Sequence, residues 1–461
     1  MLDRRQLLTG AGAVLAAGLG ATSCAGSGPT GPRTVRYWGM GAADKDKDEA
    51  ARDAFLATDA GAGAQVSIDQ VPSSGAADMS QIITAVRGGT APDVWWMDRF
   101  NAVQNASIGL LEPVDTLIEK FEDVSPEEFK SQWIQFAIDE LTYDGKLYGL
   151  PTSTDARGLL FNENVLKDSG VDLDMFDPEQ HVLTWDELRD AARQITHLDS
   201  RGNYDRLGFA PWADQGMPYT WAFGLDAQVY DNETGQVVLD SPQWKSVFDL
   251  YADWAEEFPY SRVDAFFATY QPPNAPPTQN AVFGEHLAIT TGGPWQISGN
   301  KKYAPKLPLK WTWLPVAKDG DPTYTWSGGF SLVLPKGSNM SRTTWEFMKH
   351  FTGFAGQSIV VPKLGSLPTH LRAITEKKYD PDAELFRQML PNSTSRPPIP
   401  AGSAASDTLD RAKTAVAIGS KTPQQAIDDN QAMVVPKMEL FPDYTMPDTY
   451  GKPQQIPDGE K

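Results

Sequence analysis

The stretch APDVWWMDRF, residues 91–100, sets aromatic rings beside a carboxylate and a guanidinium. Because side chains alternate between the two faces of a strand, Trp96 and Asp98 share one face while Trp95 takes the other. A ring beside a carboxylate at a strand end suits the wall of a cleft that holds something both apolar and hydroxylated. The alternative for this stretch alone is a packed core with a surface ion pair between Asp98 and Arg99.

Other rings and polar groups also stand at the ends of predicted strands. Trp38 and Met40 close the strand that begins at residue 34. Trp295 follows an apolar strand and two glycines, where we expect no helix to begin because its ring would then be exposed. Trp326 stands at a strand edge just before Gly328 and Gly329. Trp295 and Trp326 are therefore the preferred ligand-stacking candidates.

The sequence lacks the usual catalytic and metal-binding patterns, among them the P-loop, HExxH, GxSxG and CxxC. Its five histidines are scattered along the chain. The 60 acidic residues nevertheless offer many carboxylate pairs, which leaves an exported glycoside hydrolase as an alternative. We predict no catalytic residue, no metal and no cofactor.

The elements that position these residues alternate between strand and helix. We expect strands at 34–38, 64–71 and 92–97, with helices at 48–58 and 78–89 between them. This order predicts a parallel sheet with helices on its faces, and ligands of such sheets bind beyond the carboxyl ends of the strands. Farther along, aromatic residues at helical spacing in 241–258 predict a core-facing helix.

The first 23 residues have the features of an export signal: two adjacent arginines, Arg4 and Arg5, precede an apolar segment too weak to stop transfer. The arginine pair suggests the twin-arginine route. Cys24, the only cysteine, follows small residues typical of a lipoprotein cleavage box. We expect residues 1–23 to be removed, Cys24 to be lipidated and 24–32 to be a flexible tether. The protein would then lie on the outer face of the cytoplasmic membrane, held only by its lipid.

Composition narrows the partners further. The formal charge of −20 argues against nucleic acid, because phosphate backbones require a basic face. About 430 residues after the tether are enough for two or more cores. The 14 tryptophans favour a ligand-binding role for some of them, because a ring-rich chain often has rings beyond those that its core uses.

Three stretches together resemble the extracellular solute-binding proteins of ABC transporters, of the carbohydrate-binding type that includes maltose-binding protein. They are APDVWWMDRFNAVQNASIGLLEPVD, then YDGKLYGLPTSTDARGLLFNENVL with TWDEL after it, and FGEHLAITTGGPWQIS. The resemblance runs from about Val35 to about Met438. It departs from maltose-binding protein at Met217 and Ser406, where that protein has Glu and Trp, so it implies a carbohydrate without specifying a maltodextrin.

This resemblance implies an α/β fold of the type II periplasmic-binding-protein class. Each of two lobes would hold a mostly parallel sheet flanked by helices, with the hinge crossings near 151–155, 314–315 and 363–367. Lobe 1 would comprise 33–152 and 316–364, and lobe 2 would comprise 153–315 and 365–441. Residues 442–461 would form an extended or disordered tail.

By similarity, Asp98, Arg99 and Asp155 bind sugar hydroxyls and Trp295 stacks on a sugar ring, while Asp44 aligns less closely with another polar residue. The complete predicted ligand-binding set is Trp38, Met40, Asp44, Trp96, Asp98, Arg99, Asp155, Trp212, Tyr219, Trp295, Trp326, Gly328 and Gly329. The implied function is capture of an oligosaccharide or sugar derivative and its delivery to a membrane permease, by a monomer. A polyamine or a glycerophosphodiester in the same fold is the alternative ligand.

Overall fold

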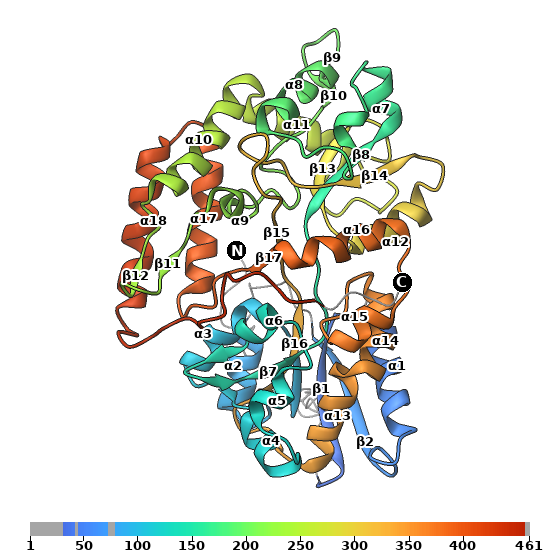
Figure 1. The fold of residues 1–461 in the computed structure, drawn as a ribbon, viewed down its shortest axis with the longest axis vertical. Coiled ribbons are helices and arrows are strands. Elements are labelled where there is room, and N and C mark those ends of the chain that lie inside the picture. Colours follow the sequence, from blue (N-terminus) through green and yellow to red (C-terminus); the bar gives the residue numbers. More distant parts are fainter. Residues whose placement is uncertain (1–30, 42–44, 72–78, 457–461) are drawn as a thin grey trace, which may run out of the picture.

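The computed structural model describes residues 31–41, 45–71 and 79–456. The predicted signal peptide, Cys24, most of the tether, Asp44 and the side chain of Met40 lie outside the described part of the chain. The remainder forms two α/β lobes, as predicted, drawn one above the other in Figure 1. Lobe 1 is the lower one in that view and lobe 2 the upper.

Lobe 1 is built on a six-stranded mixed sheet. Its strands are β1 (Thr34–Met40), β2 (Gln65–Val71), β3 (Val94–Asp98), β4 (Leu111–Glu112), β7 (Gly149–Pro151) and β16 (Phe330–Pro335). β1 pairs in parallel with both β2 and β3, which confirms the predicted parallel start of the fold. β16 then pairs antiparallel with β3. Trp38 and Asp98 therefore reach the edge of the sheet that faces lobe 2.

Short and medium helices surround this sheet. They are α1 (Lys45–Leu56), α2 (Ser80–Arg87), α3 (Ala102–Ser107), α4 (Asp115–Phe121), α5 (Pro126–Lys130), α6 (Gln135–Asp139), α13 (Arg342–Thr352), α14 (Phe354–Leu364) and α15 (Leu371–Glu376). A hairpin of β5 (Thr142–Tyr143) and β6 (Lys146–Leu147) has its turn at Asp144 and Gly145, both with positive φ. Asp-Gly is the sequence pattern typical of such a two-residue turn. The core beneath these elements includes Tyr37, Phe55 and Trp345.

The sheet of lobe 2 is antiparallel, which corrects the expectation of a mostly parallel sheet in each lobe. Its central strand β8 (Gly158–Asn162) pairs antiparallel with β13 (Ile289–Gly292) on one side and β14 (Leu309–Thr312) on the other. Helix α12 (Trp295–Tyr303) connects β13 to β14, and these two strands run in the same direction. A strand–helix–strand pattern predicts that shared direction, but it does not reveal that an earlier strand lies between the two.

Helices make up most of lobe 2. They are α7 (Glu163–Asp168), α8 (Trp185–Ile195), α9 (Pro218–Ala222), α10 (Pro242–Glu257), α11 (Tyr260–Tyr270), α16 (Pro381–Met389), α17 (Gly402–Ala417) and α18 (Pro423–Met438). The rings of Trp244, Phe248 and Trp254 on α10 are buried, which confirms the predicted core-facing helix. α8 begins with a capping box of Thr184 and Glu187.

The chain crosses between the lobes along strands that lie beside one another. The first crossing runs from β7 to β8, and its Thr154 pairs with Leu367, in the segment that joins α14 to α15. The second crossing runs from β15 (Thr325–Ser327), which pairs in parallel with β17 (Ser393–Ser395), into β16. We call the pair of β15 and β17 the hinge ladder. We predicted this crossing at 314–315, but Val316 and Tyr324 still belong to the core of lobe 2. The apolar run around residue 314 is thus a core segment of lobe 2.

The last described residues, 441–456, form what we call the C-terminal strap. It has no helix or strand, as expected of a Pro-rich tail, but it is packed and not loose. Tyr230 Oη of lobe 2 donates to Tyr444 O at 2.8 Å, while the Phe136 amide beside lobe 1 donates to Gln454 Oε1 at 3.0 Å. Thr449 Oγ1 also donates to Asp139 at 2.6 Å. The strap therefore contacts both lobes (Figure 1).

Candidate functional site

Three ion pairs and two indole rings meet where the lobes join, and we call these residues the interlobe cluster. Its members are Asp98, Arg99, Glu140, Asp155, Arg157, Trp295, Trp326 and Arg396. They come from the end of β3, the end of α6, the first crossing, the start of α12 and the hinge ladder. The fold thus gathers charges from segments far apart in the sequence at one place.

Asp98 holds the first pair. Its Oδ1 accepts a hydrogen bond from Arg396 Nη2 at 2.7 Å and another from the Phe100 amide at 3.0 Å. The Arg396 guanidinium lies 4.2 Å from the Phe100 ring centroid and 5.5 Å from that of Trp326. Side-chain exposure of 19% for Asp98 and 13% for Arg396 leaves part of each group open to a ligand.

Arg99 has a different role from the one predicted, because its side chain is completely buried. Nε donates to Glu140 Oε2 at 2.8 Å and Nη2 donates to Gly328 O at 2.7 Å, while Nη1 donates to Ser153 O. These carbonyl groups belong to two different crossings. Arg99 therefore fastens the first and second crossings to lobe 1, and its complete burial keeps it from contact with a sugar.

Glu140 is the buried partner of Arg99. Burial raises the pKa of this carboxyl group to about 7, against the attraction of the Arg99 guanidinium, which lowers it. The raised pKa fits the local geometry, because Glu140 Oε1 has no hydrogen-bond partner. The charge of this pair therefore varies within the neutral pH range.

Asp155 and Arg157 form the third pair at the mouth of the first crossing. Asp155 Oδ1 accepts from Arg157 Nη1 and also from the Gly328 amide at 2.7 Å. Burial lowers the pKa of Arg157, while the nearby Asp155 carboxylate opposes that effect. In Arg396 burial also lowers the pKa, but the carboxylates of Asp98 and Glu140 outweigh it and the pKa is raised. Both arginines stay cationic.

The two predicted stacking tryptophans differ in accessibility. Trp295 is half-buried and lies 5.1 Å from the Arg157 guanidinium, measured to the ring centroid. Contrary to our expectation, a helix does begin here. Pro294 is the N-cap of α12 and Trp295 is its first residue, so the ring stands at the end of the helix. Trp326 is fully buried: Arg157 covers its ring at 3.6 Å and its Nε1 donates to Thr220 Oγ1 at 3.0 Å. Trp295 is the ring open to a ligand.

Other predicted residues lie in the core. Trp96 is fully buried under the Lys47 ammonium, which is 3.9 Å from its ring centroid. Tyr219 is buried against Phe100, and burial raises the pKa of its phenol. The side chains of β3 do alternate between its two faces, but both faces of that strand are covered and buried.

Of the remaining predicted residues, Trp38, Trp212 and Gly329 are partly exposed and Gly328 is buried. Trp38 is half-buried beside the core of lobe 1. Trp212 packs its ring on Tyr260 and lines a separate small cavity of about 270 Å³. Gly328 and Gly329 sit at the second crossing, where a side chain on Gly329 would clash with Ser153 O and its φ of 140° also favours glycine. Glycine at these positions allows the backbone of the second crossing to lie close to that of the first.

Three residues of the cluster were missed from the sequence. Arg157 stands two positions after Asp155, and in an extended segment such residues share a face, so it could have been included. Glu140 and Arg396 carry no local signal, because only the fold brings them to Arg99 and Asp98.

Two general features of the described residues bear on function. No group of three His, Cys, Asp or Glu side chains in this part of the chain is placed to hold a metal ion. In the same residues, no helix has both the length and the apolar character needed to cross a membrane.

Residues 50–387 match the family model of bacterial extracellular solute-binding proteins, and the chain belongs to that family. Proteins of this family bind solutes and are not enzymes, so the glycoside hydrolase alternative is dropped. A putative binding protein of Brucella abortus is 21% identical over 365 residues, which cover 77% of this chain and 81% of the relative.

Solved structures show the same fold. CpMnBP1 with mannotriose bound has a TM-score of 0.74 and 22% identity, covering 87% of this chain and 99% of its own. The GacH receptor of Streptomyces glaucescens, solved unliganded and with acarbose, has a TM-score of 0.68 and 21% identity, covering 89% and 99%. A cyclo/maltodextrin-binding protein complexed with maltotetraose has a TM-score of 0.67 and 19% identity, covering 90% and 99%.

Proposed function

We propose that this protein captures an uncharged carbohydrate between its two lobes and delivers it to the permease of an ABC importer. The observation that carries the proposal is the interlobe cluster, in which the half-exposed ring of Trp295 lies beside the partly exposed pair Asp155–Arg157. The cluster also holds the partly exposed pair Asp98–Arg396. Sugar-bound proteins of the same fold support it.

The chemistry of the cluster matches that of a pyranose. The C–H face of a sugar stacks on an indole, while its neighbouring hydroxyls donate to carboxylates and accept from guanidinium groups. Asp98 and Asp155 each use Oδ1 in the contacts described above, and their second oxygens can accept from hydroxyls.

The charge balance of the cluster favours a neutral ligand. In the two partly exposed pairs, the carboxylates of Asp98 and Asp155 face the guanidinium groups of Arg396 and Arg157. A polyamine would gain from an excess of carboxylates and a glycerophosphodiester from an excess of arginines, and these two pairs offer neither.

Closure supplies the coupling between binding and transport. Asp98 belongs to lobe 1 and Trp295 to lobe 2, so a ligand that contacts both favours the state in which the lobes are close. Micromolar affinity, about −8 kcal/mol, suffices for capture and still permits release. In this proposal residues 1–23 direct export, lipid on Cys24 anchors the monomer outside the cytoplasmic membrane, and the permease reads the closed form.

A thermal-shift screen of residues 31–461 tests the ligand class. Mono- and oligosaccharides, polyamines and glycerophosphodiesters are compared, because a ligand that binds only the folded state stabilises it by about 2.7 kcal/mol at 100 times its Kd. We expect a neutral saccharide to raise the melting temperature by a few degrees. A shift with spermidine or glycerophosphocholine and none with any saccharide would refute the carbohydrate assignment.

Variants of α12 locate the site. Trp295→Ala removes the ring and should abolish the shift while leaving the unliganded melting temperature nearly unchanged, because the side chain is only half-buried. Tyr303→Ala at the other end of the same helix is the matched control, since that ring is 37% exposed and lies outside the cluster. Equal shifts in both variants would show that the ligand binds elsewhere.

A further inference from the structure

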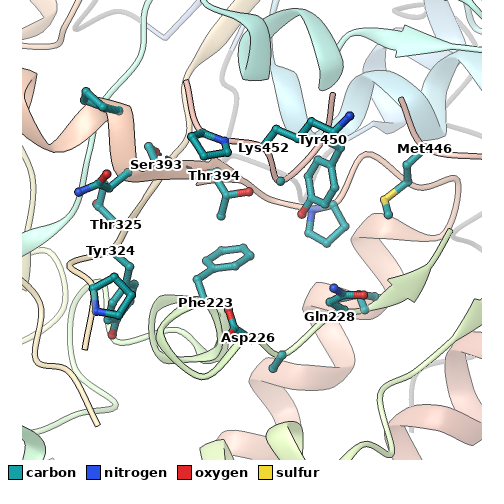
Figure 2. A pocket seen from close by; sticks show the side chains of 18 of the residues that line it. Phe223, Asp226, Gln228, Tyr324, Thr325, Ser393, Thr394, Met446, Tyr450 and Lys452 are labelled. Carbon is teal, nitrogen blue, oxygen red and sulfur yellow. Dashed lines mark hydrogen bonds between the residues drawn. The ribbon is translucent and has the colours of Figure 1, made fainter. Parts of the chain in front are cut away.

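A second hollow of about 570 Å³ lies between lobe 2, the hinge ladder and the C-terminal strap (Figure 2). We call it the strap cavity. Lobe 2 contributes Phe223 and the loop after it, the hinge ladder contributes Thr325 and Thr394, and the strap contributes Tyr450 and Lys452. Among the described residues that line it, none belongs to the interlobe cluster. It is therefore a separate feature of the molecule.

The lining of the strap cavity combines rings with uncharged polar groups. Phe223 and Tyr450 are half-buried, and Figure 2 shows Phe223 reaching from lobe 2 toward Thr394 and Tyr450. The hydroxyl and amide side chains that line it are those of Gln228, Asn232, Thr323, Thr325, Asn392, Ser393 and Thr394. The polar groups of Thr325, Ser393 and Asn232 already bond to neighbouring residues, whereas Gln228 is exposed at the cavity. Flat rings with a polar group at their side are typical of sites for small polyols.

The charged groups of the cavity wall balance. Asp226 and Lys452 are its acidic and basic lining residues, and both side chains are exposed. An anion or a cation would be attracted by one of these charges and repelled by the other, whereas an uncharged molecule would not be repelled by either. The volume lies within the 300–1,000 Å³ range of small-molecule pockets and accommodates one or two sugar rings.

Hydrogen bonds and backbone conformation within the protein hold the walls of the cavity in place. Tyr450 Oη donates to Ser395 O at 3.0 Å, which holds the ring of the strap against the hinge ladder. Asp226 has a φ of 51°, a left-handed conformation that is uncommon for a residue other than glycine, and it directs the loop along the cavity. Such a preformed wall loses little entropy when a ligand binds.

From these observations we propose that the strap cavity is a second binding site, for a small uncharged saccharide or polyol, independent of the interlobe cluster. A molecule there contacts lobe 2, the hinge ladder and the strap together. Its binding would therefore respond to the same crossing segments that move when the lobes close.

The test uses saturation-transfer NMR of residues 31–461 with glucose and maltose as probes at millimolar concentration. The background is the double variant Trp295→Ala/Asp155→Asn, which removes the interlobe contacts. In this background, Gln228→Trp fills the cavity from an exposed position. Glu233→Trp on the same loop is the matched control, because Glu233 is exposed and does not line the cavity.

We expect the double variant to retain a signal for at least one probe, Gln228→Trp to weaken that binding at least tenfold, and Glu233→Trp to leave it unchanged. Absence of any signal in the double variant, or equal binding by the two tryptophan variants, would overturn the proposal. Failure of the interlobe assignment is distinguished separately, since the unmodified protein and the double variant would then give the same binding curve.

Discussion

The role of Arg99 as a buried clamp predicts a pH-dependent loss of stability when it is replaced. Arg99→Met keeps a side chain of similar length but removes the Nε contact with Glu140 and the Nη contacts with Gly328 O and Ser153 O. Glu140 is then left in the core as a carboxyl group without its cation. The size of the effect depends on whether that carboxyl group is ionised.

The sign of the pH dependence of stability follows from the difference in proton binding between the folded and unfolded states. Glu140 has a pKa of about 7 in the folded protein against an ordinary value of 4.5, so the folded state binds more protons between those values and stability falls as pH rises through them. At 1.36 kcal/mol per pH unit, that fall is about 3 kcal/mol. Without Arg99 the pKa rises further, and the fall continues above pH 7.

The cost of Arg99→Met is therefore largest in mild alkali. Near pH 8 we expect about 3–5 kcal/mol, the range found when one partner of a buried pair is removed. Near pH 5.5 Glu140 is neutral in both proteins, so only the lost donors to Gly328 O and Ser153 O remain, and the cost falls to about 1–3 kcal/mol.

Urea unfolding followed by tryptophan fluorescence at both pH values measures this difference. Arg193→Met is the control, because the exposed pair of Arg193 and Glu257 should contribute less than about 1 kcal/mol at either pH. If Arg99→Met cost the same at both pH values, or no more than the control, Arg99 would not be a buried clamp.

Three further perturbations test the fold around the site. Trp326→Ala should lower the unfolding free energy by about 3–5 kcal/mol, because the indole is fully buried, and a melting curve close to the parent's would contradict that burial. Removal of residues 441–461 exposes the pockets of Tyr444 and Met446 and should cost about 3–6 kcal/mol; an unchanged urea midpoint would show the strap to be detached. Thr184→Ala breaks the capping box of α8 and should cost about 1 kcal/mol in the same assay, with no loss if the box does not form.

Local patterns of the sequence predict much of the fold. The alternation of strand and helix before residue 98 gave the parallel start of lobe 1, and the ring spacing of α10 gave a core-facing helix. Both succeed because periodicity reports which side of an element is buried. The antiparallel β8 and the late second crossing were missed, because strand neighbours and lobe boundaries depend on contacts between distant segments.

The sequence predicted only part of the candidate site, again because local patterns do not show which distant segments meet. Asp98, Asp155 and Trp295 stand at segment ends and are found together in the interlobe cluster. Trp96 and Arg99 belong to the same stretch but are buried, because burial at the end of a strand is decided by the residues that cover it. Those covering residues come from elsewhere in the chain.

The pairing of β3 with β16 has a consequence for biosynthesis. Arg99 and Phe330, which meet at the end of this pair, are 231 positions apart, and the whole sheet of lobe 2 is encoded between them. The nascent chain must therefore carry an open β3 edge until the ribosome has produced residues 330–335. Long-range closure of this kind is slow and an unpaired edge invites aggregation, so we expect the sheet of lobe 1 to be completed late and to be open to aggregation until then.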